Sequence, residues 1–205
     1  MKDKNRKLPT VSLGGAEFYV DARRGLLIDT LNNDNHFHIY EMLRSDDHFE
    51  IVFDKESRNL KVSEWINIAD ERYEYIWLRP LGVYDPEGAK ECLTEEDRLF
   101  LKDLPVINIG GVKFLWEKES NLLFQQDNPW NVIARNYNKS GAEQEGFYFD
   151  RQKSLVPFPH EMPSDKTKLP SHICFIPESE IIKQIKHSQQ QAAGIIPLKR
   201  RRKLK

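Results

Sequence analysis

The stretch LPTVSLGGAEF, at residues 8–18, returns as LPVINIGGVKF at residues 104–114. The offset is 96 residues, and it continues without a gap to residue 35, with nine identities over residues 8–35. A repeat at a fixed offset indicates one structural unit written more than once, and this offset is longer than the period of solenoid or propeller repeats. The sequence therefore predicts two copies of one small module.

Each copy of this stretch has the pattern of a β-hairpin. Apolar and polar residues alternate on both sides of a glycine pair, Gly14-Gly15 in the first copy and Gly110-Gly111 in the second. A two-residue turn between such strands requires positive φ angles, which glycine adopts without steric cost. A phosphate-binding loop would instead need glycines that lead into a helix. We therefore interpret both pairs as turns.

Four short segments rich in β-branched and aromatic residues each end at an acidic residue, namely Asp21, Asp54, Glu117 and Asp150. Such segments favour strands over helices. Two of the carboxylates could act as a glycosidase-like pair. An acid at the entrance to a turn, however, commonly binds its own backbone, so we interpret all four as structural.

Helices are predicted after the last strand of each copy. Asp85-Pro86-Glu87 has a cap, a proline at the first helical position and an acid beside the helix dipole, which predicts a helix to about Cys92. Thr94 and Asp97 resemble a capping box for a second helix. Ser179 is predicted to cap a third helix, at residues 180–193.

These patterns together predict an α+β fold, mainly antiparallel β-hairpins with short helices, internally duplicated. The first β-rich module is expected at 8–103 and the second at 104–180. A basic helix and a disordered tail are expected at 181–205.

The charges are segregated along the chain. Lys and Arg number 31 and Asp and Glu 32, but residues 1–7 carry +3, residues 181–205 carry +8, and residues 8–180 carry −12. Six cations lie in the last seven positions: Lys199, Arg200, Arg201, Arg202, Lys203 and Lys205. Such a run predicts salt-sensitive binding to nucleic acid. Contact with anionic lipid, nuclear import and a solubilising tail stay open.

The cellular setting is predicted from other features. Residues 1–7 are not followed by the apolar region of a secretory signal, and no stretch reaches the about 18 apolar residues of a membrane span. Cys92 and Cys174 are too few for a disulfide framework. We interpret them as buried, reduced thiols, with a single bridge as the alternative, and expect a cytoplasmic protein.

The histidines give a weak metal signal. His36 and His38 alternate on an expected strand, and with His48 or Glu41 they could hold a metal ion. Because no CxxC or HExxH motif accompanies them, we interpret them as a surface pair and expect no metal and no cofactor.

Aromatic residues could stack nucleic-acid bases. The candidates are Trp65, Trp77, Trp116 and Trp130, with Tyr73 and Tyr75. Because an acidic body repels phosphate, we assign the strand aromatics to the core. Trp130 lies in an expected turn, and it is therefore the candidate interaction residue.

Several of these motifs resemble a known family. The repeated Gly-Gly phrase, NPWNVI at residues 128–133 and LGVYDPEGA at residues 81–89 are similar to a family of uncharacterised two-module bacterial proteins associated with conjugative and other mobile elements of gut anaerobes. The resemblance covers most of residues 8–180. The second copy departs from it, with IPES at 176–179 in place of Asp-Pro-x-Gly. The family implies no known activity, so no catalytic residue is carried over.

We expect a non-enzymatic interaction or adaptor protein with an unidentified protein partner, linked to a mobile genetic element. The first alternative is a nucleic-acid-binding module that uses the C-terminal helix and tail. The second is an enzyme with a site between the two modules, which no residue pattern in the sequence supports.

Overall fold

The computed structural model describes residues 6–61, 70–134, 146–165 and 168–192 of the chain. The chain divides into two units. Unit 1 comprises Met1–Leu99 and Asn128–Val132, and unit 2 comprises Phe100–Asp127 and Ile133–Lys205.

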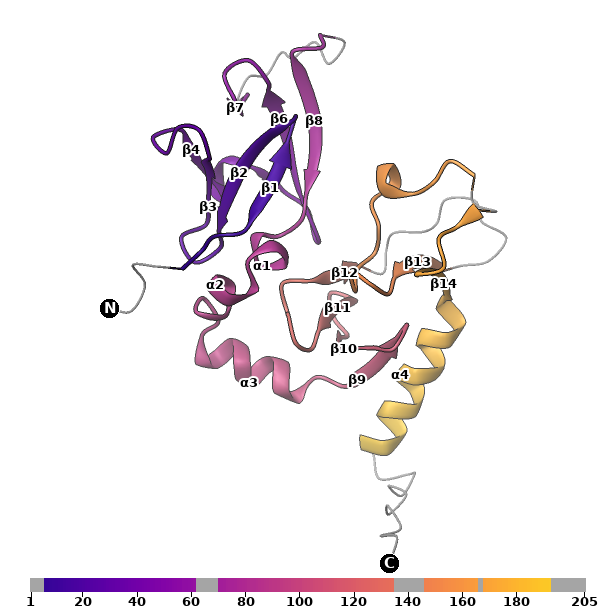
Figure 1. Cartoon of the computed structure of the whole chain (residues 1–205). Helices are drawn as coiled ribbons and strands as arrows, with labels where there is room; N and C mark the ends of the chain where they lie inside the picture. The colour runs from indigo at the N-terminus through magenta and orange to yellow at the C-terminus, as the bar shows by residue number, and fades with distance from the viewer. Residues whose placement is uncertain (1–5, 62–69, 135–145, 166–167, 193–205) are drawn as a thin grey trace, which may run out of the picture. The chain divides into compact units, whose positions relative to one another are not determined.

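Unit 1 contains two antiparallel sheets (Figure 1). The first has the order β1-β2-β3-β4, formed by β1 (Thr10–Leu13), β2 (Ala16–Asp21), β3 (Leu26–Asp29) and β4 (His36–His38). The second contains β5 (Leu43–Arg44), β6 (Phe49–Asp54), β7 (Asn59–Leu60) and β8 (Tyr73–Leu78). In this sheet β8 pairs with β6 along their whole length, so that Phe49 lies opposite Leu78 and Asp54 opposite Tyr73.

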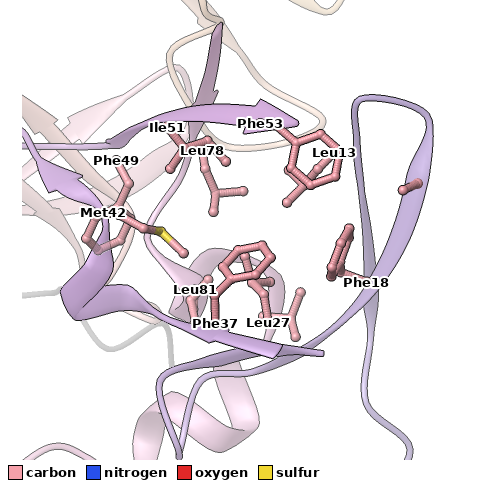
Figure 2. Packing of buried hydrophobic residues seen from close by; sticks show 12 residues of the cluster. Leu13, Phe18, Leu27, Phe37, Met42, Phe49, Ile51, Phe53, Leu78 and Leu81 are labelled. Atoms are coloured by element: carbon pink, nitrogen blue, oxygen red, sulfur yellow. The ribbon is translucent and has the colours of Figure 1, made fainter. Parts of the chain in front are cut away.

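The hydrophobic core of unit 1 lies between these sheets, as Figure 2 shows. The ring of Phe18 packs 5.3 Å from that of Phe37 and edge-on, 5.7 Å, against Phe53. Alternate residues of a strand point to one face, and the first sheet therefore supplies Leu13, Phe18 and Leu27 while β6 and β8 supply Phe53 and Leu78. Edge-to-face aromatic packing of this kind stabilises a core beyond the area it buries.

Unit 2 has a closely similar set of strands. The order β12-β11-β10-β9 is formed by β9 (Val106–Ile109), β10 (Val112–Glu117), β11 (Leu122–Gln125) and β12 (Val132–Ala134), and β13 (Gly146–Asp150) pairs with β14 (Ile173–Pro177). Its buried cluster includes Ile107, Phe114, Leu123 and Phe149, and the rings of Phe114 and Phe149 lie 5.9 Å apart.

The register of these strands recurs at the offset of 96. Leu13 lies opposite Ala16, and Ile109 opposite Val112. At both turns the glycines have positive φ, 56° and 81° in the first and 58° and 96° in the second. The predicted hairpins and the α+β class with mainly antiparallel sheet are confirmed. The sequence also predicts a strand that returns after Asp150 at Leu155-Val156, but there Leu155 forms only an isolated bridge with Asp150.

The helices are α1 (Leu81–Tyr84), α2 (Pro86–Lys90), α3 (Glu95–Asp103) and α4 (Glu178–Ala192), with 3₁₀ turns η1 (Ile39–Glu41) and η2 (Pro159–Glu161). The predicted starts of α2 and α3 are confirmed, since Asp85 accepts the Gly88 N–H at 3.0 Å and Thr94 the Asp97 N–H at 3.1 Å. The predicted cap of α4 is wrong, because the helix begins at Glu178 and Ser179 lies in its first turn.

Helix α4 packs on the core of unit 2 and covers the free edge of β9. Ile181 and Ile185 are buried in the core cluster. The side-chain amide of Gln184 accepts the N–H of Asn108 and donates to its carbonyl, both at 2.7 Å, and the hydroxyl of Ser188 donates to the Val106 carbonyl at 3.2 Å. Gln184 thus hydrogen-bonds to β9 as a neighbouring strand would.

Candidate functional site

The acid at the end of each predicted strand accepts backbone hydrogen bonds from the turn that follows. Oδ1 of Asp54 accepts the N–H groups of Glu56 and Ser57, at 3.0 and 3.4 Å. Asp21, Glu117 and Asp150 likewise accept N–H groups two or three residues further on. The interpretation of these carboxylates as turn-forming residues is confirmed.

Asp54 also forms a forked ion pair with Arg72. Nε of Arg72 donates to Oδ1 at 2.8 Å, and Nη2 donates to Oδ2 at 2.5 Å. The backbone of Arg72 is fixed at the start of β8, where its carbonyl accepts the Lys55 N–H at 3.0 Å. The guanidinium holds the pKa of the buried Asp54 well below the usual 3.8. A guanidinium therefore satisfies both oxygens of this carboxylate.

Asp150 of unit 2 has the same backbone setting and a different partner. It ends β13 as Asp54 ends β6, and the carbonyl of His172 accepts the Arg151 N–H at 2.9 Å. His172 thus stands where Arg72 stands in unit 1. Its Nε2 lies 3.7 Å from Oδ2 of Asp150, which is beyond hydrogen-bond distance.

A pocket of about 330 Å³ opens beside this pair. The ionisable side chains that line it are Asp150, Lys153, Glu161 and His172, and its remaining wall includes Pro157, Met162, Pro163 and Pro170. Lys153 Nζ lies 3.6 Å from Oε1 of Glu161. The pocket thus joins a buried carboxylate to a wall of apolar side chains, between β13, η2 and β14.

A second pocket, of about 450 Å³, lies in unit 1 beside Asp29. The Asp29 carboxylate is 1% exposed, and Arg58 donates to it from Nε and Nη2, each at 2.6 Å. Asn35 adds a third bond at 3.2 Å. These bonds hold the pKa of Asp29 well below 3.8, the hydrogen bond from Arg58 above all. This carboxylate is therefore already neutralised by its own chain.

The basic start of the chain contributes to a third ion-pair cluster. Arg6 donates from Nη1 to Asp85 and from Nη2 to Asp21, the latter at 3.2 Å. Burial raises the pKa of Asp85, but hydrogen bonds from Arg6, Gly88 and Ala22 outweigh it, and the pKa is lowered. Sequence reasoning missed Arg6, because an arginine among four basic residues gives no sign of which distant acid it contacts.

The histidine pair lies on β4, as the alternation predicts. Nδ1 of His38 accepts the Tyr40 N–H at 3.2 Å. The imidazole of His38 also stacks on the ring of Tyr40, with the ring centroids 4.1 Å apart. His48 is buried beside Asp47, whose Oδ1 lies 2.7 Å from its Nδ1. Among the described residues, no group of three or more His, Cys, Asp or Glu side chains is arranged to hold a metal ion.

The aromatic candidates are dispersed. Trp116 is buried in the core of unit 2, and Trp65 lies outside the described residues. The assignment of the strand aromatics to the core is wrong for Tyr75, which is exposed on the outer face of β8. Trp130 is half-buried and contacts Gly82, whose carbonyl accepts the Asn128 side-chain amide at 3.0 Å. The structure therefore packs Trp130 against α1 within unit 1.

The two thiols are free, and the expectation that both are buried is wrong. Cys92 is exposed and Cys174 is half-buried. Cys92 follows the short helix α2, which leaves one side of its side chain in solvent. Its Sγ contacts the carbonyls of Ala22 and Arg23 at 3.7 Å.

The six cations at 199–205 lie outside the described residues. Of the basic segment, the described part is the stretch of α4 from residue 181. There Lys183 and Lys186 are exposed, on the side away from Ile181 and Ile185.

None of the described helices is long and apolar enough to cross a membrane.

No family model, curated protein or solved structure matches the chain. The candidate site is therefore assigned from its own geometry, and the carboxylate of Asp150 with the pocket beside it is the site best defined by the described residues.

Proposed function

We propose that the chain is a non-enzymatic interaction protein, an adaptor made of two copies of one module and linked to a mobile genetic element. The recurrence of strand register at 96 residues supports the duplication. The observation that carries the interaction function is an aromatic surface on the outer face of the β5–β6–β8 sheet.

This surface follows from the strand register. Leu43 lies opposite Glu50, and Glu50 lies opposite Trp77, so the three side chains form one row across the sheet. Tyr75, two residues from Trp77, shares their face, and its hydroxyl donates to Glu50. Leu43 is 68% exposed and Tyr75 46%. Tyrosine and tryptophan are enriched at protein interfaces, since they combine large contact area with a polar group.

Site-specific photo-crosslinking tests this function. The photoreactive residue p-benzoylphenylalanine replaces Tyr75 in one variant and, as a control, Phe100 of α3 in another, because Phe100 is similarly exposed at 50%. Cells that produce the chain are irradiated, and adducts are identified by mass spectrometry. A discrete protein adduct at position 75 and none at position 100 supports the proposal. Equal adducts at both positions, or none at position 75, contradict it.

A second candidate function is binding to nucleic acid through the C-terminal segment. The exposed Lys183 and Lys186 on α4 favour it, because they extend the charge of residues 199–205 onto a described surface. Binding to generic duplex DNA is measured against salt concentration for the full chain and for a chain ending at residue 194. Counterion release predicts weaker binding and a shallower salt slope after truncation. Unchanged affinity and slope would exclude the tail.

A further inference from the structure

We propose that the pocket beside Asp150 binds a guanidinium group, supplied by an arginine side chain of a partner protein. The proposal deepens the interaction function above and rests on it for the source of the arginine. The chemistry of the pocket rests on the described residues alone.

The Asp150 carboxylate is only partly satisfied within the described part of the chain. Asp150 is 3% exposed, and its Oδ1 accepts the N–H groups of Gln152 and Lys153 at 2.8 and 3.0 Å. Oδ2 has no hydrogen-bond donor within the described part of the chain, and His172 stays 3.7 Å away. Oδ2 is not sealed from solvent, so a donor that enters the pocket can reach it. A charged donor there would form a stronger hydrogen bond than a neutral one.

Unit 1 of the same chain shows which donor fits this setting. Asp54 caps its turn with the same two backbone bonds and, in addition, accepts the fork of Arg72 at 2.8 and 2.5 Å. Both carboxylates end a strand and face the residue that precedes its antiparallel partner strand, β8 in unit 1 and β14 in unit 2. The geometry around Asp150 therefore has room for two N–H groups of a planar guanidinium, which bind a carboxylate in parallel.

The pocket has the space and the charge to receive an arginine side chain. His172 is shorter than the arginine at the matching position, and a pocket of about 330 Å³ remains beside it. Asp150 and Glu161 contribute two carboxylates and Lys153 one ammonium group, which lies close to Glu161. The prolines and Met162 offer apolar surface to the methylene groups of an arginine, which pack well on such walls.

Binding is tested with N-acetyl-arginine amide, followed by chemical-shift changes in the ¹⁵N spectrum of the full chain. The citrulline analogue has the same shape without the charge, and the lysine analogue has the charge without the fork. We expect shifts at Asp150, His172 and their neighbours with the arginine analogue, and at least tenfold weaker binding for the other two. Equal affinity for the lysine or citrulline analogue would overturn the guanidinium assignment.

Two variants separate binding from folding. His172→Arg should fill the pocket with an internal guanidinium, as in unit 1, and thereby weaken binding at least tenfold while raising the melting temperature. Lys118→Arg adds a guanidinium on the exposed surface of the same unit and serves as control. Asp150→Asn should also weaken binding at least tenfold. Undiminished binding to a folded His172→Arg or Asp150→Asn protein would overturn the site.

The source of the arginine is tested with peptides. A peptide that carries one arginine should bind more tightly than N-acetyl-arginine amide and lose binding when that arginine is replaced by citrulline. Peptide binding no tighter than that of the free analogue overturns the partner protein as the source. Crosslinking at position 75 does not depend on this pocket, so the failure of either proposal is visible separately.

Discussion

Single aspartates at the ends of strands show how this chain stabilises buried negative charge. A carboxylate placed at the start of a turn gains backbone N–H donors, but burial still makes its second oxygen costly unless a cation approaches. Asp54 has Arg72 as this cation and Asp29 has Arg58. Asp150 has only a distant imidazole. The residue that precedes the paired strand, Arg72 before β8 and His172 before β14, therefore separates a closed ion pair from an open pocket.

The glycine turns provide a test at the same scale. A Cβ at Gly110 would lie 2.7 Å from Cδ1 of Phe149, whereas a Cβ at Gly111 meets nothing within 4 Å. Both residues have positive φ. We expect Gly111→Ala to lower the free energy of unfolding by about 1 kcal/mol through backbone strain alone. Gly110→Ala should cost about 2–4 kcal/mol, because it also crowds the core. Urea unfolding of both variants measures the difference, and equal losses would contradict the crowding.

At the scale of elements, helix α4 is bound to its unit by hydrogen bonds to β9 and by two buried isoleucines. Gln184 should contribute through its two bonds to Asn108. We expect Gln184→Ala to cost about 0.5–1.5 kcal/mol and to accelerate hydrogen exchange of the Asn108 amide. Gln190→Ala, at an exposed position of the same helix, serves as control. Unchanged exchange at Asn108 in the Gln184 variant would contradict this role.

Replacing Ile181 tests the apolar side of the same helix. Ile181 is fully buried, so Ile181→Ala should lower the free energy of unfolding by about 2–5 kcal/mol. Ile182→Ala is the neighbouring control, because Ile182 is partly exposed. Thermal unfolding of both variants provides the comparison, and similar melting temperatures would be inconsistent with the burial.

The elements that depend on a short stretch of sequence were predictable. The glycine turns, the alternating strands and the caps Asp85 and Thr94 depend on residues within a few positions of one another. The pairing of β6 with β8 and the start of α4 were not predictable in this way, because tertiary packing decides them. The candidate pocket was not foreseen either, since it appears only when β13, η2 and β14 come together.

At the scale of the whole molecule, the ion pairs predict how stability depends on pH. The pKa values of Asp29 and Asp54 are lowered in the folded state relative to the usual 3.8. Such groups stabilise the fold above the unfolded pKa, and this contribution is lost as the pH falls through the folded pKa. We expect the free energy of unfolding to decline as the pH is lowered below about 5.

Two charge-removing variants test this dependence. Asp29→Asn and Asp54→Asn should each flatten the decline, while Asp46→Asn, at an exposed position, should leave it nearly unchanged. Chemical unfolding between pH 2 and pH 7 measures all three. An equal slope in every variant would show that the ion pairs with Arg58 and Arg72 do not determine acid sensitivity.

The partners of these acids also mark the limit of sequence reasoning for the whole molecule. Arg72 contacts an acid 18 residues away, Arg58 one 29 residues away and Arg6 one 79 residues away. A long, flexible arginine gives no local pattern that names its partner. The segregation of charge along the chain was visible in the sequence, but which cations pair with a buried acid was not.

Gln184 hydrogen-bonds to the edge strand β9 in place of a neighbouring strand, and this has a practical consequence for solubility. An uncovered strand edge offers N–H and C=O groups to any other extended chain, and so promotes aggregation. The Gln184 amide occupies those groups of Asn108, and the Ser188 hydroxyl takes the carbonyl of Val106. A shortened chain that ends before α4 would expose β9 as a template for self-association. Chains cut to remove the basic tail should therefore retain residues up to 192.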